Sequence, residues 1–272
     1  MNKKQSLDII VLSNTINDEI YRMNIDCINS LNDSEKGRHI INVLLIESNK
    51  QSKYFYPDNV QQIIPDENFN YNRFMNVGIR HSTADFVALC NNDILFSSGW
   101  FSEIVNFAAE HKNVLSFSPF DPANKYTVEN YRIPNVYYGY GVRKEIAGWC
   151  IVVKREIFNI IGYCDETFDF YYVDDDYNMT LRKHALKHAL ITASCVKHLG
   201  GQVTKAVMKR ESTAETSMCK TGDNWLNKNP KAMEGHKKFH KKWGSQRSIA
   251  MKNRFFKILS FLNKKCITNL VY

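Results

Sequence analysis

Amide and carboxylate side chains directly follow a largely apolar segment in the first half of the chain. Residues 85–90 (DFVALC) run into Asn91, Asn92 and Asp93. Oxygen ligands in such a position suit a hard divalent cation, which also accepts water as a ligand. Asparagine and aspartate are also common turn residues that bind nothing. These residues alone therefore leave both a metal site and an ordinary turn open.

Three consecutive acids, Asp174, Asp175 and Asp176, open a segment that we expect to be helical. Acids at a helix start cap free N–H groups and interact favourably with the helix dipole. Neighbouring carboxylates also raise one another's pKa, which suits a general base. Helix capping and base catalysis are both open interpretations.

His198 ends another apolar segment and precedes two glycines. A single histidine is usually a packed or surface residue, although neutral imidazole also binds divalent ions. The sequence has no Gly-x-Gly-x-x-Gly, P-loop, Gly-x-Ser-x-Gly or His-Glu-x-x-His motif. The common dinucleotide, kinase and hydrolase signatures are therefore missing.

Apolar segments alternate with segments of helical spacing along the first 120 residues. We expect strands at 7–12, 40–46, 62–64, 85–90 and 114–118, and helices at 20–31, 71–80 and 100–111. This alternation predicts an α/β domain with a mostly parallel sheet. Ligands of such sheets bind beyond the carboxyl ends of the strands. The polar loops 13–15, 47–49 and 91–93 fall there.

The second half of the chain is less regular. Residues 119–146 are rich in Tyr, Pro and Asn and show no period. Strands are expected at 149–153 and 189–196, with a short helix at 154–161 and a turn at 162–165. We predict a domain over residues 1–204 and a basic, partly helical C-terminal extension over residues 205–272.

The positive charge lies in that extension. The chain has 36 Lys+Arg and 28 Asp+Glu, a formal charge of +8, but residues 205–272 hold 16 of the bases and 4 of the acids. The extension therefore carries +12, and the remaining residues carry −4. A basic segment of this kind favours an anionic partner such as a membrane surface, nucleic acid or an acidic substrate.

The sequence also suggests where the protein resides. Its seven cysteines are odd in number and lack Cys-x-x-Cys spacing, which argues against a disulfide framework or zinc ribbon. The apolar run before Ser13 is too short for a signal sequence, and no run approaches the roughly 18 apolar residues of a membrane span. We expect a cytoplasmic protein, with attachment to the membrane periphery as an open alternative.

Several segments, taken in order, resemble the family 2 glycosyltransferases of the GT-A fold, over about residues 6–201. The segments that carry the resemblance are 76–93 (NVGIRHSTADFVALCNND), 148–168 (GWCIVVKREIFNIIGYCDETF) and 175–182 (DDYNMTLR). The resemblance implies a Rossmann-like α/β domain with a mostly parallel central sheet and flanking helices. The basic, helical C-terminal tail would lie outside it.

The chain departs from the family pattern at four positions. Asn91 replaces the first acid of Asp-x-Asp, which leaves Asp93 as the only carboxylate there. Asp85 replaces a frequent Gly, Asp175 replaces the commoner Glu, and Asn178 replaces a later Asp. The loss of the first acid bears on metal affinity, although nucleotide phosphates supply most of the ion's other ligands.

The resemblance implies inverting transfer from a nucleotide-diphosphate sugar, with a UDP sugar favoured, to a hydroxyl of a glycan, a lipid-linked molecule or another acceptor. Asp93 and His198 would hold Mn²⁺ or Mg²⁺ on the diphosphate. Asp176 would be the base, and Asp175 would orient the acceptor.

The remaining implied residues divide between donor and acceptor. Gly148 and Trp149 would border the acceptor, where Trp149 could equally be a packed core residue. The nucleotide sugar would be bound by Ser13, Asn14, Glu47, Arg73, Asn91 and Asn92.

Two other classes of protein compete with this interpretation. A nucleotidyltransferase would also need a metal carboxylate, but its Gly-rich basic loop is replaced here by SNTIND at residues 13–18. A non-catalytic module that binds nucleotide sugars or polyanions would need the acids only as helix caps.

The tail shows an apolar stripe at helical spacing, surrounded by Lys and Arg. Such a helix can lie on an anionic membrane, or dock on the body with its basic face in solvent. Nucleic acid is a less favoured partner. A transferase that acts on modified nucleic-acid bases would need such a basic surface to bind its acceptor. The stripe consists of Met251, Phe255, Ile258, Leu259 and Leu262.

Overall fold

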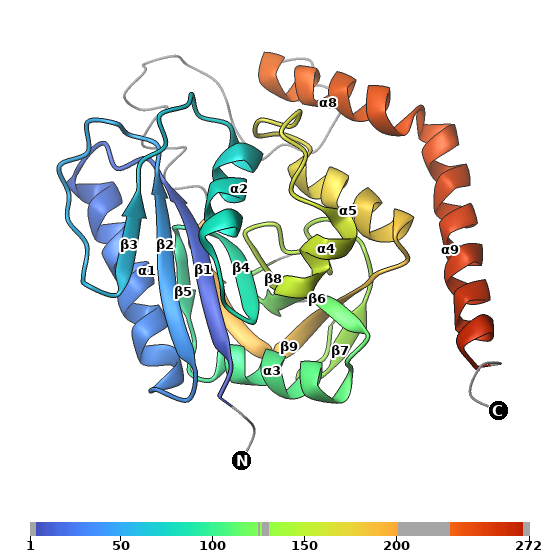
Figure 1. Ribbon diagram of the computed structural model, residues 1–272, viewed down its shortest axis with the longest axis horizontal. Helices are drawn as coiled ribbons and strands as arrows, with labels where there is room; N and C mark the ends of the chain where they lie inside the picture. Colours follow the sequence, from blue (N-terminus) through green and yellow to red (C-terminus); the bar gives the residue numbers. More distant parts are fainter. Residues whose placement is uncertain (1–3, 125, 127–130, 201–228, 269–272) are drawn as a thin grey trace.

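The computed structural model describes residues 4–124, 126, 131–200 and 229–268, with side chains described up to residue 258. A nine-stranded sheet runs through the molecule in the order β3-β2-β1-β4-β8-β6-β9-β5, and β7 pairs with β9 (Figure 1). The strands are β1 (Ser6–Ser13), β2 (Ile40–Glu47), β3 (Val60–Ile63), β4 (Phe86–Asn91), β5 (Ile94–Phe96), β6 (Val114–Phe120), β7 (Val136–Tyr138), β8 (Cys150–Lys154) and β9 (Lys187–His198).

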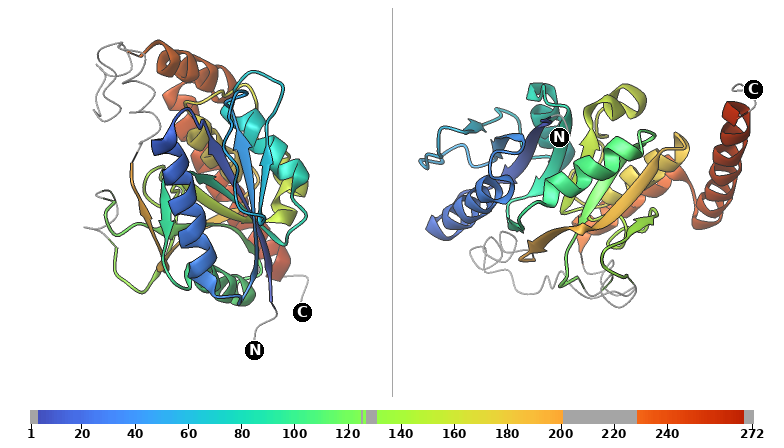
Figure 2. Two further views of the ribbon diagram at one scale, coloured as in Figure 1. Left: turned by 90° about the vertical axis from the view of Figure 1, so that its left-hand side faces the viewer. Right: turned by 90° about the horizontal axis from the view of Figure 1, so that it is seen from below.

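Helices cover both faces of this sheet and continue beyond it. The cluster on one face includes residues of α1 and α3, and the cluster on the other face includes residues of α2 and α5 (Figure 2). The helices are α1 (Asp18–Glu35), α2 (Tyr71–His81), α3 (Trp100–Glu110), a 3-10 helix (Arg155–Ile157) leading into α4 (Phe158–Ile161), α5 (Val173–Lys183), α8 (Pro230–Trp243) and α9 (Gln246–Thr268).

The predicted α/β architecture is confirmed. The sheet is parallel from β3 to β4, because the connections through α1 and α2 return the chain to the same edge. Beyond β4 the sheet is mixed, since β8 pairs antiparallel with both β4 and β6. Two strands were not predicted, β5 and β7, and each has only three residues, too few to show a period.

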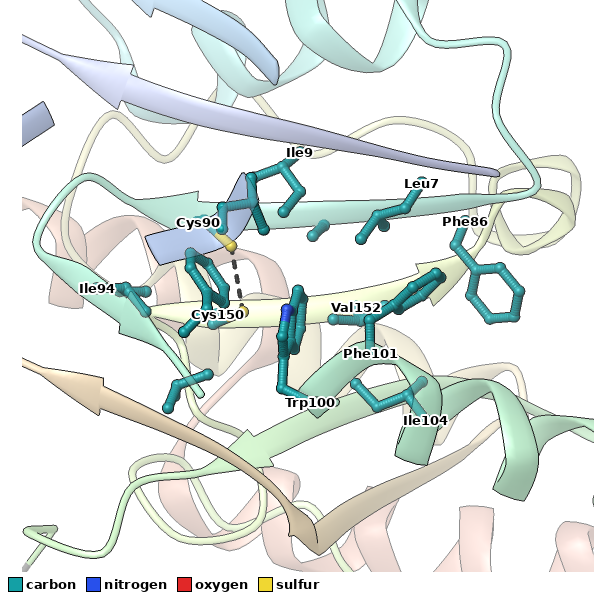
Figure 3. Packing of buried hydrophobic residues seen from close by; sticks show 14 of the residues in the cluster. Leu7, Ile9, Phe86, Cys90, Ile94, Trp100, Phe101, Ile104, Cys150 and Val152 are labelled. Carbon is teal, nitrogen blue, oxygen red and sulfur yellow. Dashed lines mark hydrogen bonds between the residues drawn. The ribbon is translucent and has the colours of Figure 1, made fainter. Parts of the chain in front are cut away.

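The core on the α1 and α3 face consists of aromatic and aliphatic side chains around the middle strands (Figure 3). Trp100 and Phe101 are fully buried at the start of α3. Cys90 and Cys150 face each other across β4 and β8 with their sulfur atoms 3.1 Å apart, and both are free thiols. This rigid layer lies directly beneath the strand ends that carry the predicted site.

Part of the C-terminal extension is packed against the body. Phe239 and Trp243 of α8 are buried together with Phe168 and Met179, a residue of α5. The predicted boundary at residues 204 and 205 lies outside the described residues. None of the described helices has both the length and the apolar composition needed to cross a bilayer.

Candidate functional site

The carboxyl ends of three parallel strands bring the predicted donor residues to one edge. In the register of the sheet, Ser13 pairs with Glu47 and Leu12 pairs with Asn91. The predicted residues Asn14, Asn92 and Asp93 follow in the adjoining loops. The topology therefore assembles these side chains from segments that are far apart in the sequence.

A buried network of polar side chains forms the floor of this edge. The Asn24 amide donates to the hydroxyl oxygens of Ser13 (2.8 Å), Thr15 (3.1 Å) and Tyr56 (2.7 Å). The side-chain amide of Asn92 donates in turn to Oδ1 of Asn24 at 2.7 Å. Because each group is satisfied by its neighbours, the network fixes the loops after β1 and β4 relative to each other.

Thr15, Asn24 and Tyr56 were not predicted from the sequence. Asn24 did leave a signal, because it stands among Ile20, Met23 and Cys27, which all belong to the buried face of α1. A polar residue on an apolar helix face needs a buried partner.

Glu47 is completely buried at the end of β2. Its Oε1 atom accepts hydrogen bonds from the backbone N–H groups of Thr15 (3.0 Å) and Asn49 (2.7 Å). Its Oε2 atom is buried and has no hydrogen-bond partner among the described residues. A buried carboxylate oxygen without a partner is costly, so this atom is a candidate to accept a hydrogen bond from a ligand.

The predicted metal ligands Asp93 and His198 lie side by side. They flank the antiparallel pairing of β5 with β9, in which Ile94 is opposite His198. Nε2 of His198 lies 3.2 Å from Oδ1 of Asp93, yet this buried nitrogen makes no hydrogen bond of acceptable geometry to any described residue. An imidazole nitrogen and a buried carboxylate that are this close suit a shared divalent cation.

Protein side chains alone do not complete such a site. Within the described part of the chain, no group of three or more His, Cys, Asp or Glu residues could hold an ion. An ion at Asp93 and His198 would therefore need further ligands from a bound molecule or water, as Mg²⁺ sites commonly do.

The predicted acceptor residues lie beside this pair, at the start of β8. The Trp149 ring stacks on His198, with centroids 5.4 Å apart and an angle of 18° between the planes. The backbone carbonyl of Trp149 accepts from the N–H of Asn91 at 2.9 Å. Trp149 thus fixes the orientation of the His198 ring, and it also packs against the core.

The three acids of α5 have different surroundings. Asp174 lies against Gly148, and a Cβ atom at Gly148 would overlap the Asp174 carboxylate. Burial, followed by the charge of Asp175, raises the pKa of Asp174 to about 6, against a lowering effect of Arg143. Burial also raises the pKa of Asp175, which Arg143 opposes. These are conditions that suit a general base near neutral pH.

Asp176 lies on the other side of the helix and is bound by α8. Its Oδ1 atom accepts from Nε1 of Trp243 at 2.7 Å, and Nζ of Lys242 lies 2.7 Å from Oδ1 and 3.0 Å from Oδ2. The same ammonium group contacts Oδ2 of Asp165 at 2.7 Å. Burial raises the pKa of Asp176, and Lys242 opposes that rise. Burial lowers the pKa of Lys242, but its bonds to the two carboxylates outweigh this effect and the net shift is upward.

Helix geometry explains why neighbouring acids separate in this way. Successive residues of an α-helix are rotated by about 100°, so residues two positions apart point about 200° apart. Asp174 therefore faces the β8 loop while Asp176 faces α8. Tyr71, at the start of α2, lies close enough to Asp174 to be affected by its charge, since burial and then Asp174 raise the Tyr71 pKa.

Arg73 is engaged elsewhere on α2. Its Nε atom donates to Oε2 of Glu166 at 2.9 Å, and Asn76 donates to Oε1 of the same carboxylate at 3.1 Å. Asn76 also bonds the backbone of Cys164. The contacts attach the turn before α5 to α2, and no described contact links Arg73 to the donor edge.

Residues 27–174, more than half of the chain, match the sequence profile of glycosyl transferase family 2. The chain belongs to this family. No curated protein sequence matches it.

Solved glycosyltransferases share its fold. GalNAc-T7, in a crystal structure with UDP, GalNAc and Mn²⁺, has a TM-score of 0.63 at 9% identity, over 73% of this chain and only 44% of the GalNAc-T7 chain. TarS from S. aureus has a TM-score of 0.51 at 14% identity, over 87% of this chain and 72% of its own. The mannosyltransferase PcManGT from Pyrobaculum calidifontis, solved with GDP-Man and Mn²⁺, has a TM-score of 0.52 at 12% identity. The match covers 98% of this chain and 88% of the PcManGT chain. At these identities the likeness concerns the fold, and the predicted GT-A architecture is confirmed.

Proposed function

We propose that this protein transfers a sugar from a UDP sugar to a hydroxyl group of a glycan or lipid-linked acceptor, with inversion at the anomeric carbon and with Mn²⁺ or Mg²⁺ bound. The observation that carries the proposal is that two buried atoms without a hydrogen-bond partner among the described residues, Oε2 of Glu47 and Nε2 of His198, both lie at the carboxyl ends of strands of the sheet. Membership of glycosyl transferase family 2 supports it.

Glu47 supports a uracil base in the donor. Oε1 already accepts hydrogen bonds from two backbone N–H groups, which leaves the buried Oε2 as the carboxylate oxygen that can accept from a ligand. Uracil offers one N–H donor on its pairing edge, whereas guanine offers two neighbouring donors that suit a carboxylate with both oxygens free. We assign Ser13 and Asn14 to the same nucleotide pocket.

Asp93 and His198 would hold the metal ion, and Asn91 and Asn92 would border the diphosphate. When bound, the ion neutralises negative charge on the departing nucleotide diphosphate. Trp149 keeps the His198 ring in place by stacking, and the hydrogen bond of Asn92 to Asn24 keeps the loop that carries Asp93 in place. GalNAc-T7 and PcManGT were each solved with Mn²⁺ and a nucleotide or nucleotide sugar, which favours the same chemistry here.

We assign the base to Asp174 in preference to Asp176. Both oxygens of Asp176 are already close to the Lys242 ammonium, and one also accepts from Trp243. Asp174 instead faces the loop at Gly148 and has a pKa near 6, so it is mostly ionised at neutral pH and still basic enough to accept a proton. Asp175 would orient the acceptor, and Asp176 would hold α5 in position.

The transfer needs one displacement. The acceptor hydroxyl gives its proton to a carboxylate oxygen of Asp174 as its oxygen forms a bond to the anomeric carbon. The bond from that carbon to the diphosphate oxygen breaks, and its electron pair leaves with the nucleotide diphosphate. A single attack from the face opposite the leaving group inverts the configuration.

We propose that the protein resides in the cytoplasm. The described cysteines are free thiols, which suits a reducing cytoplasm. A cytoplasmic enzyme would act on acceptors that reach it in solution or at the inner surface of a membrane.

The test is a screen of purified protein against UDP, GDP, CDP and dTDP sugars, read as thermal shift with and without Mn²⁺. A bound donor stabilises the fold by mass action, so we expect a metal-dependent shift with a UDP sugar, and slow hydrolysis or transfer of that donor. If a donor stabilised the protein but no glycan, lipid-linked or DNA acceptor received the sugar, the protein would be a non-catalytic nucleotide-sugar-binding module. Turnover restricted to DNA would move the acceptor to modified bases, and a shift only with GDP sugars would overturn the role of Glu47.

A further inference from the structure

One face of α9 is apolar and lies exposed among the residues that the structure describes. Met251, Phe255 and Ile258 are 67%, 57% and 56% exposed. They recur at intervals of four and three residues, so they form one stripe along the helix. Large apolar side chains with this exposure are unusual on a monomer when they are contiguous.

A different face of α9 packs against the body. Ile249 and Phe256 pack against the cluster around Phe239 and Trp243, and Lys252 donates to the backbone carbonyl of Trp243 at 2.7 Å. At about 100° per residue, this docked face and the exposed stripe point in directions about 125° apart around the helix. The exposed stripe is therefore not the surface by which α9 attaches to the body, and Figure 2 shows α9 projecting from the rest of the molecule.

The exposed stripe is bordered by positive charge. Arg247, Arg254 and Lys257 are exposed on the same helix, and α9 contains no Asp or Glu along its whole length. On α8, which precedes it, Lys231, Lys237 and Lys241 are exposed too. The pattern of an apolar stripe flanked by bases is that of a helix lying in the plane of an anionic lipid surface.

We propose that α9 docks this protein on anionic membrane surfaces, with Met251, Phe255 and Ile258 inserted among the lipids and the flanking bases on the headgroups. A second copy of the chain fits less well, because two helices of high positive charge without acids would have to meet face to face. Binding to nucleic acid would explain the exposed Lys and Arg side chains but not the apolar stripe. The proposal does not depend on the transfer reaction.

The surface can be tested with the full-length protein and sedimented vesicles. Vesicles of phosphatidylcholine alone are compared with vesicles that also contain phosphatidylglycerol, at low and high salt. We expect retention on the anionic vesicles at least about tenfold above the neutral ones, with much of it lost at high salt. Equal retention on both vesicle types, or none, would overturn the proposal.

Two double variants separate the apolar stripe from exposed apolar residues in general. Phe255→Ser/Ile258→Ser should lower partitioning by more than about tenfold. The control Ile40→Ser/Ile160→Ser changes two residues with 50% and 45% exposure on other elements and should bind like the unchanged protein. Unfolding temperatures of both variants report whether the fold is intact.

Other partners give distinct results. Suppose that the unchanged protein is a dimer, that the stripe variant is a monomer, and that the variant still binds vesicles normally. The stripe on α9 would then be a self-association surface. Salt-sensitive binding to DNA that persisted in the stripe variant, without vesicle binding, would indicate nucleic acid. Either result would contradict the proposal, and neither would bear on the donor site.

Discussion

The donor side and the acceptor side of the candidate site are held in place in different ways. The donor side rests on the ends of parallel strands, whose register brings Ser13, Glu47 and Asn91 to one edge. The acceptor side rests on the rotation of α5, which is fixed by the contacts of Asp176 with Lys242 and Trp243 of α8. Sheet topology therefore positions the proposed donor residues, while helix packing from the C-terminal extension positions the proposed base.

The largest expected effect concerns the donor side. Asp93→Asn removes the carboxylate proposed to hold the metal ion, so kcat/KM should fall on the order of 10³-fold and the Mn²⁺-dependent thermal shift should vanish. The fold should survive, because strand register and not this carboxylate holds the edge together. The matched control is Asp58→Asn, an exposed acid in the loop before β3. Full activity of Asp93→Asn without added metal would refute the assignment.

The next effect tests whether α8 belongs to the acceptor side. Lys242→Met leaves the buried Asp176 carboxylate without its cation, which should lower the free energy of unfolding by about 2 kcal/mol. This figure lies between the values for exposed and for fully buried ion pairs, because Asp176 is buried but the Lys242 side chain is one-third exposed. Urea denaturation measures it, with Lys241→Met as the exposed neighbouring control.

A double variant makes that test specific. Asp176→Asn/Lys242→Met should lose less stability than the sum of the two single variants, since both remove the same interaction. Strict additivity would mean that α8 and α5 are energetically independent.

A smaller effect is expected in the nucleotide pocket. Glu47→Gln keeps the shape of the side chain but replaces a charged acceptor with an amide, which should raise the KM for a UDP sugar by about tenfold. The value of kcat should change little, because the group binds the donor equally in the ground and transition states. A fall in kcat with unchanged KM would place Glu47 in the chemical step instead.

The pH dependence should report the acceptor side. Asp174 must be ionised to accept a proton, so kcat/KM should rise with pH through about 6. The contribution of Asp174 to the free energy of unfolding changes in the opposite direction and falls as the pH rises. Because burial raises the pKa in the folded state, this group contributes most to stability below its unfolded-state pKa of about 4, and the contribution is lost as pH rises through 6. A rate profile that is flat between pH 5 and 7 would exclude Asp174 as the base.

The donor side could be predicted from the sequence because strand ends are visible in it. Apolar runs followed by polar residues located Glu47 and Asp93, and the parallel arrangement predicted that the loops carrying them would lie at one edge of the sheet. The family resemblance, and not the strand pattern, associated His198 with Asp93. Asn24 and Tyr56 escaped because their role depends on a network between α1 and the loop before β3.

The acceptor side could be predicted only in part. The sequence located the three acids, but the rotation of α5 about its axis is set by packing against Phe239 and Trp243, more than 60 residues further on. The positive charge of the extension suggested that it is a separate unit. In the structure, however, its residues Lys242 and Trp243 bind the Asp176 carboxylate. Arg73 was expected at the donor, and its bond to Glu166 could not be foreseen from spacing.

The central claim is that Asp174, and not Asp176, takes the proton from the acceptor. The direct test compares Asp174→Asn with Asp176→Asn for kcat at saturating donor, together with donor binding and unfolding temperature. We predict that Asp174→Asn loses about 10³-fold in kcat while donor binding and stability hold, and that Asp176→Asn mainly loses stability and keeps kcat within about tenfold. A stable Asp176→Asn protein without activity, beside an active Asp174→Asn protein, would contradict the claim.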